Sequence, residues 1–585
     1  MNGPRHREVP LVHLALTLLL VTLPVGDTPA LANHDNGAPA NAVIVQGPTV
    51  STARDLVLAG GGSVTHELPI IRAVAARLTA TQQERLVALA PELKIYGDRT
   101  VSITGKPPKD GDNTSTDELT GMPFNDIVGA DQLHAAGIDG TGVTVAVVDT
   151  GHYSQRGLNK NTTNQVRVLA QYDARLDQQQ EYNPLLNTDE NGHGAHVASV
   201  VVNSANLGSN KSPAFAGVAP NAELVVVHAF DRYGSSTYAD VIRGLQWILD
   251  NAASYGIRVV NLSFSAEPRS YYWDDPLNQA VMRLWQAGIV VVASAGNRGP
   301  EAMTIGVPGN VPYVITVGAM TDNFTPRDPA DDLLTSFSST GPTVEGFVKP
   351  EVVAPGGHVK GLMATSTELA VTHPEFHDGA NYFVMSGTSQ AAAVVTGVVA
   401  LMLHQSPFLT PDEVKFRLME SARPATFNRG SLVYPVFQQG AGRVDAYGAV
   451  YSDSPLVANR GLDIDLDLAG LAHFGGAADA YASNGGQGYT FFVRDADGNP
   501  VEDDGFLWSD EYVFQDGFLW SDGFLWSDGF FWSDGFLWSD GFLWSDGFLW
   551  SDGFLWSDDY THFSGFLWSE TYVEPASINV WVEQE

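Results

Sequence analysis

Three side-chain types that together perform acyl transfer are spread widely over the sequence. Asp149 follows the apolar run 143–148, His193 comes 44 residues later, and Ser389 lies a further 196 residues on. A serine hydroxyl is a weak nucleophile at neutral pH, so it needs an adjacent base, which a histidine supplies and a carboxylate orients. Together these three residue types could supply a nucleophilic serine, its base and a carboxylate that orients the base.

Taken singly, each of these residues also has a simpler explanation. Asp149 stands in an Asp-Thr-Gly sequence of the kind that is often only a turn. His193 and His196 could be a metal-binding pair, although no acidic third ligand has a suitable local spacing. Ser389 opens an Ala/Val-rich run, where a serine commonly caps a helix. The chemical interpretation therefore rests on the whole set, which also includes Asn297 at the end of another apolar run.

The apolar runs predict the elements that must position these side chains. Buried strands that alternate with helices indicate an α/β fold with a parallel sheet covered by helices on both faces. Such sheets place reacting groups at the carboxyl ends of their strands. The predicted strands are 143–148, 224–227, 259–260, 289–293 and 314–317, the predicted helices are 238–251 and 275–287, and two further helices begin near His193 and Ser389.

Several motifs in a fixed order resemble those of the subtilisin-like serine proteases, the subtilases. The resemblance covers residues 121–452 and implies a subtilisin-like peptidase domain and a serine endopeptidase. It implies that Ser389 is the nucleophile, His193 the base, Asp149 the residue that orients it, and Asn297 a donor to the oxyanion. The matching segments are 147–151, 193–198, 217–220, 261–263, 295–297 and 387–389, and residues 440–447 look like the family's domain end.

The same resemblance implies how a peptide substrate binds, namely by adding a strand between two segments of the enzyme. Arg298 would lie at the mouth of the pocket, where it could favour an acidic side chain or simply be solvated. Ala195, Ala393 and Ser265 depart from the family pattern, which usually has Thr, Pro and Gly there; they affect pocket geometry and remove no reacting atom. The expected substrate-binding residues are Ser263, Phe264, Ser265, Gly234, Ser235, Ser294, Ala295 and Gly296.

The first 120 residues predict export and delayed activation. Basic residues, the largely apolar run 9–25 and the Ala-Leu-Ala of 30–32 are typical of a secretory signal peptide over residues 1–32, rather than of a membrane anchor. Residues 33–120 contain a small α+β unit at 41–103, which resembles the family's inhibitory propeptide, and then a polar linker. We expect a zymogen that is secreted to the extracellular space or the cell surface and is inhibited by its own propeptide.

The amino-acid composition excludes some classes of binding partner and cofactor. The net charge is −36, so the phosphates of nucleic acid are excluded as a natural partner and the expected substrates are proteins or peptides. The absence of cysteine excludes disulfides, zinc–thiolate sites, iron–sulfur clusters and a cysteine nucleophile. The chemistry needs no cofactor. Relatives often bind calcium near the segment 203–213; this chain has no carboxylate there, so a structural calcium ion stays open and no metal ligand is assigned.

The region 453–585 has a different composition. Gly-Phe-Leu/Phe-Trp-Ser occurs nine times between Gly505 and Ser569, and residues 501–585 hold 18 acidic side chains and no Lys or Arg. In an extended chain the six-residue period would put Phe and Trp on one face and Leu on the other. A stacked β-rich module and a disordered tract both remain open. Contact with a cell surface or a polymer is expected, and the alternative function is a non-catalytic or weakly catalytic surface adhesion protein that acts through this tail.

Overall fold

The computed structural model describes residues 39–103, 123–180, 183, 185–208, 214–325, 331–427, 432–482, 489–494, 500–501 and 577–578. The predicted signal peptide, the linker 105–120 and the repeats lie outside these ranges. The chain divides into two units, Met1–Ala40 and Asn41–Glu585, and the described helices and strands all belong to the second. Among the described helices, none combines the length and the apolar character that crossing a membrane requires.

Residues 41–97 form a small α+β unit, as predicted. Four antiparallel strands in the order β2-β3-β1-β4 make its sheet, with two helices packed on it. Thr79 and Gln82 form a capping box at the start of the second helix. Pro69 leads a 3₁₀ turn through Ile71, so the third strand begins only at Ala73. The elements are β1 Asn41–Gln46, α1 Val50–Ala59, β2 Ser63–Leu68, η1 Pro69–Ile71, β3 Ala73–Leu78, α2 Ala80–Leu89 and β4 Lys94–Gly97.

A nine-stranded sheet forms the centre of the larger part, in the order β14-β13-β12-β11-β6-β9-β7-β8, with β15 also paired to β13. Its interior pairings are all parallel, whereas β14 and β8 pair antiparallel at the ends. The sheet is therefore mixed and not wholly parallel as expected. Its strands are β6 Thr144–Asp149, β7 Val168–Asp173, β8 Gln178–Gln180, β9 Glu223–His228, β11 Ile257–Leu262, β12 Val290–Ser294, β13 Ile315–Thr321, β14 Leu333–Leu334 and β15 Val352–Pro355.

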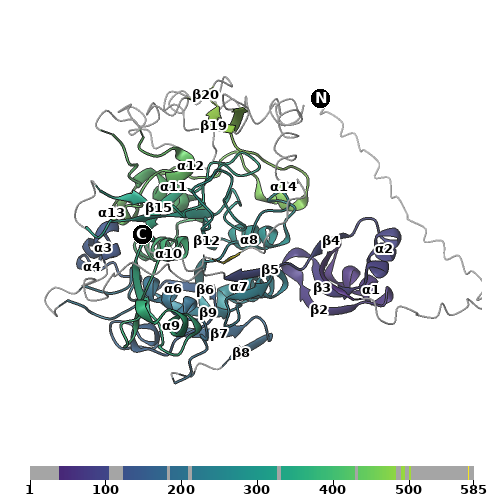
Figure 1. Ribbon diagram of the computed structural model, residues 1–585, viewed down its shortest axis with the longest axis horizontal. Coiled ribbons are helices and arrows are strands. Elements are labelled where there is room, and N and C mark those ends of the chain that lie inside the picture. The colour runs from purple at the N-terminus through teal and green to yellow at the C-terminus, as the bar shows by residue number, and fades with distance from the viewer. Residues whose placement is uncertain are drawn as a thin grey trace, which may run out of the picture. The chain divides into compact units, whose positions relative to one another are not determined.

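Helices cover both faces of this sheet. Figure 1 shows α6 (His193–Val202) and α10 (Thr388–Gln405) on one side of β6 and β12, and α7 (Tyr238–Tyr255) and α8 (Pro276–Gln286) on the other. Helix α10 is buried from Thr388 to Leu403, which explains its uniformly small and apolar sequence. The other described elements here are α3 Pro123–Val128, α4 Ala130–Ala135, α5 Arg156–Asn159, β16 Val359–Leu362, α9 Glu368–Thr372, η2 Pro374–Phe376, β17 Tyr382–Met385, α11 Pro411–Ser421, α12 Val436–Gln439 and α13 Ala446–Tyr451.

A short strand that the sequence did not predict joins the small unit to the larger part. Strand β5 (Thr100–Ile103) pairs antiparallel with β10 (Ser235–Thr237), so that Val101 lies opposite Ser236. The side chain of Val101 is completely buried. Strand β21 (Ser577–Ile578) pairs with β5 in parallel. One of the segments expected to bind substrate is therefore already paired within the chain.

Packing continues beyond residue 452. In α14 (Ile464–Ala469), the buried Asp467 carboxylate accepts hydrogen bonds from the hydroxyls of Tyr272 (2.6 Å) and Tyr313 (3.1 Å). Strands β18 (Ala478–Ala482), β19 (Tyr489–Arg494) and β20 (Pro500–Val501) then form a small antiparallel sheet. A domain boundary at residue 452 stays a prediction, but 453–482 contributes to the same core.

Candidate active site

The imidazole of His193 and the carboxylate of Asp149 meet in the interior. Asp149 is the last residue of β6, and His193 is the first residue of α6. His193 Nδ1 lies 2.8 Å and 2.9 Å from the two carboxylate oxygens of Asp149. Burial alone would lower the pKa of His193, but the carboxylates of Asp149 and Asp189 together raise it. Within the described residues, His193 Nε2 has no hydrogen-bond partner, so it can accept a proton.

Two glycines allow this meeting because they let the strand end approach the helix start. A Cβ atom on Gly151 would lie 2.7 Å from the carbonyl oxygen of Thr188, and Gly151 also has a φ of +132°. A Cβ atom on Gly194 would lie 2.9 Å from the backbone of Gly151. Real Cβ atoms do not come so close to backbone atoms, so a larger residue at 151 would displace the segment before α6, and one at 194 would push α6 away from the end of β6. The Asp-Thr-Gly and His-Gly sequences are thus explained by the packing around the imidazole.

Ser389 is the second residue of α10, whose N-cap residue is Gly387. Its hydroxyl is buried and donates to the carbonyl oxygen of Ser263, 3.0 Å away, and the Ser263 hydroxyl donates back to the carbonyl of Ser389. No hydrogen bond joins Ser389 Oγ to His193 among the described residues. The structure therefore brings Asp149 and His193 together and holds the serine hydroxyl just past the end of β11.

The carboxamide of Asn297 is held by the residue before Ser389. Asn297 Oδ1 accepts hydrogen bonds from both the N–H and the hydroxyl of Thr388, each at 3.0 Å. The Thr388 hydroxyl in turn accepts from the N–H of Gly296. A Cβ atom on Gly387 would lie 3.3 Å from Asn297 Nδ2, so glycine at 387 leaves room for this amide group. The arrangement directs the amide hydrogens of Asn297 away from Thr388.

The expected substrate-binding residues form two separate groups. Ser263, Phe264 and Ser265 follow β11 and are buried, and Ser294 Oγ donates to the carbonyl of Phe264 at 3.2 Å. Ala295 and Gly296 continue from β12, next to them. A Cβ atom on Gly296 would lie 3.0 Å from Ser265 Oγ, which places the two segments against each other. The second group, Gly234 and Ser235, lies at the start of β10, which pairs with β5.

Arg298 does not present an uncompensated charge. Its guanidinium lies 3.7 Å from the carboxylate of Glu267, and its side chain donates to the carbonyl of Thr304. Burial lowers the pKa of Arg298, while Glu267 raises it. The pairing with Glu267 weakens the case for an acidic preference at this position, although it does not remove the positive charge.

The described part of the expected calcium segment, residues 203–208, does not suit a calcium ion. The side-chain oxygen of Asn203 already accepts the N–H of Ala205, and that of Asn206 accepts the N–H groups of Gly208 and Ala214. Calcium is held by several oxygens that include carboxylates, and within the described residues no cluster of three or more His, Asp or Glu side chains could hold a metal.

A buried arginine provides positive charge beside this segment. Arg167 is almost fully buried, and burial lowers its pKa to about 9, so it remains charged at neutral pH. A fixed cation here repels a divalent one. Its guanidinium donates to the main-chain carbonyls of Lys160 (2.7 Å), Val202, Pro220 (2.6 Å) and Ala222 (3.3 Å).

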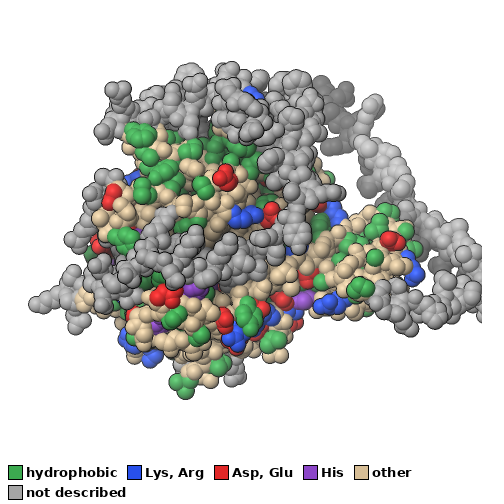
Figure 2. Space-filling model, viewed as in Figure 1, with side chains coloured by type: hydrophobic (Ala, Val, Ile, Leu, Met, Phe, Trp, Pro, Cys, Tyr) green, Lys and Arg blue, Asp and Glu red, His purple; other side chains and the backbone are tan. Residues whose placement is uncertain are grey.

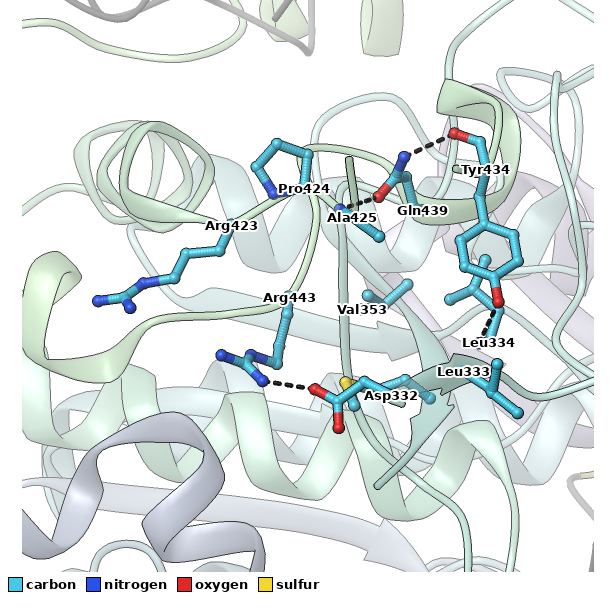
Figure 3. Close-up of a pocket in the computed structure, with 11 residues that line it drawn as sticks. Asp332, Leu333, Leu334, Val353, Arg423, Pro424, Ala425, Tyr434, Gln439 and Arg443 are labelled. Carbon is cyan, nitrogen blue, oxygen red and sulfur yellow. Dashed lines mark hydrogen bonds and ion pairs between the residues drawn. The ribbon is translucent and has the colours of Figure 1, made fainter. Parts of the chain in front are cut away.

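A cavity of about 160 Å³ lies elsewhere, beside β14 and β15. Figure 3 shows that Arg443 points to Asp332, and Gln439 to Ala425 and Tyr434, within its own wall. Arg423, which also lines the cavity, points away and pairs with Asp445 outside it. None of the expected site residues lines it. It is a separate feature from the Asp149–His193 site.

Sequence reasoning missed the carboxylate of Asp189, which is buried beside the same site. The sequence did offer one indication: Asp189 stands in a polar run just before the expected helix. Aspartate at such a position commonly accepts hydrogen bonds from the first N–H groups of the helix. It also treated Thr150 only as a turn residue and did not predict that its side chain would take part in the site. The Thr150 hydroxyl donates to Asp189, so both residues belong to the hydrogen bonds around the start of α6.

Comparison with known proteins gives a consistent result. Residues 140–448 match the model of the Subtilase family. The chain is 38% identical over 318 residues to serine protease AprX of Bacillus subtilis (strain 168), covering 54% of this chain and 67% of that protein. It is 32% identical over 298 residues to subtilisin DY of Bacillus licheniformis, covering 51% and 89% respectively. The crystal structure of fervidolysin from Fervidobacterium pennivorans, described as a keratinolytic enzyme related to subtilisin, has a similar fold, with a TM-score of 0.55 at 23% identity over 78% of this chain and 68% of that one.

Proposed function

The chain belongs to the subtilase family and is a serine endopeptidase, and from this premise we propose that Asp149, His193 and Ser389 form its catalytic triad, with Asn297 in the oxyanion hole. The observation that carries the proposal is the pairing of His193 Nδ1 with both oxygens of Asp149. This pairing fixes the ring so that Nε2 is the acceptor nitrogen, and it stabilises the ring once protonated.

In the proposed reaction, the hydroxyl of Ser389 leaves the carbonyl of Ser263 by rotating about its Cα–Cβ bond and donates to His193 Nε2. As Ser389 Oγ attacks the peptide carbonyl, its proton passes to His193, which then gives it to the leaving amine. The acyl-enzyme is hydrolysed by the reverse sequence with water. No cofactor enters these steps.

The oxyanion of the tetrahedral intermediate would be held by Asn297 Nδ2 and by the N–H of Ser389. Two features support this assignment. The opposite end of the Asn297 carboxamide is bound to Thr388, which leaves its amide hydrogens directed elsewhere. Ser389 is also at the start of α10, where main-chain N–H groups lack acceptors within the helix and the helix dipole favours negative charge.

We further propose that the chain is made as a secreted zymogen whose residues 33–120 are the inhibitory propeptide and linker. The pairing of β5 with β10 supports this, because it occupies an edge on which a substrate strand is expected. The small unit also holds the larger part through polar contacts, such as Lys94 with Asp274 and His66 with Asp240. Neither the family match nor the similarity to AprX and subtilisin DY supports the alternative of a non-catalytic adhesion protein.

The test of the triad is covalent labelling by a serine-directed phosphonate after maturation. We expect the wild-type chain to label stoichiometrically, and Ser389→Ala and His193→Ala not to label. Ser386→Ala is the matched control, because Ser386 is a nearby buried serine to which the proposal gives no chemical role. Equal labelling of Ser389→Ala, or no labelling of the folded wild-type enzyme, would contradict the proposal.

The zymogen and secretion proposals need their own measurements. The Ser389→Ala chain, expressed alone, should be exported and keep residues 41–103, whereas the wild-type chain should lose them by self-cleavage. Mass spectrometry of the exported protein identifies both ends. If Ser389→Ala matures normally in a protease-free host, self-processing is wrong; if intact residues 1–32 are found on the exported chain, the signal peptide is wrong.

A further inference from the structure

A second buried carboxylate lies next to the Asp149–His193 pair and has no part in the triad. Asp189 Oδ1 accepts the N–H groups of Asn191 (3.1 Å) and Gly192 (2.7 Å) and the hydroxyl of Thr150 (2.9 Å). Asp189 Oδ2 accepts the N–H of Ala195 at 2.7 Å. Asp189 is only 4% exposed. Both of its oxygens are therefore committed to the start of α6 and to the residue that follows Asp149.

The hydroxyl of Thr150 completes this link. It donates to Asp189 and accepts the N–H of Gly194, 2.8 Å away. Thr150 is bonded through the main chain to Asp149, and Gly194 follows His193. The side chains of Thr150 and Asp189 thus tie the end of β6 to the first turn of α6, which are the two places that carry the triad carboxylate and the imidazole.

Asp189 also contributes charge. The carboxylates that act on His193 are those of Asp149 and Asp189, and both raise the pKa of the imidazole against the effect of burial. His196, on the same helix, and His228, on β9, lie nearby; burial lowers the pKa of both, to about 3 for His196, so they are neutral near pH 7. Arg175, Asp173 and Asp189 also act on His228. A second negative charge therefore favours the protonated form of His193.

From this geometry we propose that Asp189 is a positioning residue for catalysis: with Thr150, it sets the distance between Asp149 and His193, and its charge supports the imidazolium formed during the reaction. The inference rests on the proposed triad. It adds a group that touches neither the substrate nor the reacting atoms and that acts through the first turn of α6.

The test compares Asp189→Asn with Glu190→Gln. Both changes replace a carboxylate by an amide at adjacent positions, but Glu190 is exposed and is placed in no part of the site. We expect Asp189→Asn to lower kcat/KM by about tenfold or more, and to move the acid limb of its pH profile downward by roughly half a pH unit or more. Glu190→Gln should keep the wild-type kcat/KM and the wild-type acid limb. Loss of activity through unfolding alone would not shift the acid limb.

A second pair of variants keeps the proposal testable if Asp189→Asn does not mature. Thr150→Ser retains the bridging hydroxyl and should behave as wild type, whereas Thr150→Val removes it and should lower kcat more than it raises KM. Phosphonate titration normalises each rate to active enzyme. Coincident acid limbs for Asp189→Asn and Glu190→Gln, or equal rates for Thr150→Val and Thr150→Ser, would overturn the inference. A wild-type enzyme that does not label would instead overturn the triad.

Discussion

Thr388 binds the carboxamide oxygen of Asn297, so if Asn297 holds the oxyanion as proposed, the Thr388 hydroxyl should affect catalysis without touching substrate. Thr388→Val should lower kcat by about tenfold with little change in KM, because an oxyanion exists only in the transition state and intermediate. Thr388→Ser keeps the hydroxyl and should stay close to wild type. Steady-state kinetics on a small peptide substrate measure both.

Asn297→Ala provides the reference for this effect. Removing one oxyanion donor typically costs about 100- to 1000-fold in kcat. Since Thr388 is expected to act through Asn297, Thr388→Val should add little in the Asn297→Ala background, which a double-mutant cycle measures. Full additivity of the two changes would show that Thr388 acts by another route.

Two buried histidines make stability fall in acid. Burial lowers the pKa of His152 to about 4 and that of His196 to about 3. The unfolded chain therefore binds more protons between these values and pH 6.5, so stability decreases as the pH falls through this window. Glu345 acts oppositely, because burial raises its pKa to about 7 and the folded state holds its proton between pH 7 and 4.5. The net loss should therefore be steepest below about pH 5.

Urea unfolding of the Ser389→Ala chain at several pH values measures this dependence without autolysis. His152→Gln should reduce the difference in unfolding free energy between pH 7 and pH 4 by roughly 3 kcal/mol, because one titrating group is removed. An unchanged pH dependence in His152→Gln would contradict the assignment.

At the scale of elements, Arg167 joins segments that are distant in sequence. Its guanidinium connects the end of α5, the end of α6 and the turn before β9 through four carbonyls. Arg167→Met should lower the free energy of unfolding by about 3 kcal/mol or more, because these carbonyls lose buried donors. Arg167 places a fixed positive charge beside the segment where relatives bind calcium, and this charge repels a calcium ion. EDTA, which removes calcium, should therefore leave the Tm of the wild-type chain unchanged.

Thermal unfolding in the Ser389→Ala background checks both statements. Arg258→Met is the control, because Arg258 also donates to two main-chain carbonyls but is only partly buried. It should cost clearly less than Arg167→Met. A fall of several degrees in Tm on adding EDTA to the wild-type chain, reversed by calcium, would contradict the expectation.

The elements differ in how well local sequence predicts them. The Val-rich strands β6, β9, β11, β12 and β13 are buried on both faces, so their apolar runs are continuous and were predicted. Strand β5 was missed because it is short and alternates polar with apolar residues, and its partner β10 lies far away in the sequence. Pairing of that kind has no local signal.

In the candidate site, too, contacts between residues distant in sequence could not be predicted. The motifs around Asp149, His193, Asn297 and Ser389 were readable because the family resemblance orders them. Asp189 and Arg167 depend on which backbone groups come within hydrogen-bond distance after folding, and only the structure supplies this. The mixed character of the sheet likewise depends on the short end strands β8 and β14, which carry little sequence pattern.

At the scale of the whole molecule, the strongly acidic region begins at a different place from the end of the packed core. Half of the net charge of −36 lies in residues 501–585, whereas on the face drawn in Figure 2 acidic and basic side chains are interspersed among the described residues. We propose that the acidic repeat region serves attachment and not catalysis. Packing, however, extends past residue 452 through the contacts of Asp467 with Tyr272 and Tyr313.

Two truncations test this division. A chain that ends at Val501 should keep the wild-type Tm and rate on a small peptide, and should lose retention on cells or insoluble protein. A chain that ends at Ser452 should have a lower Tm, because two buried tyrosine hydroxyls lose their acceptor. If the Val501 truncation abolishes peptide cleavage while it stays folded, the repeat region belongs to the catalytic unit. If the Ser452 truncation is equally stable, residues 453–482 are dispensable.

Asp98 directly follows the small N-terminal unit, and its carboxylate accepts the N–H of Ala239 at 3.0 Å, so the segment 41–103 supplies a cap to α7, a helix of the larger part. If residues 41–103 are cut away, that cap leaves with them, and the Thr237 hydroxyl remains to serve the same helix end. The mature enzyme would then lack a contact that helped to form it. The lifetime of the folded mature enzyme would then be set by its unfolding rate. A mature chain that unfolded would not readily refold without residues 41–103.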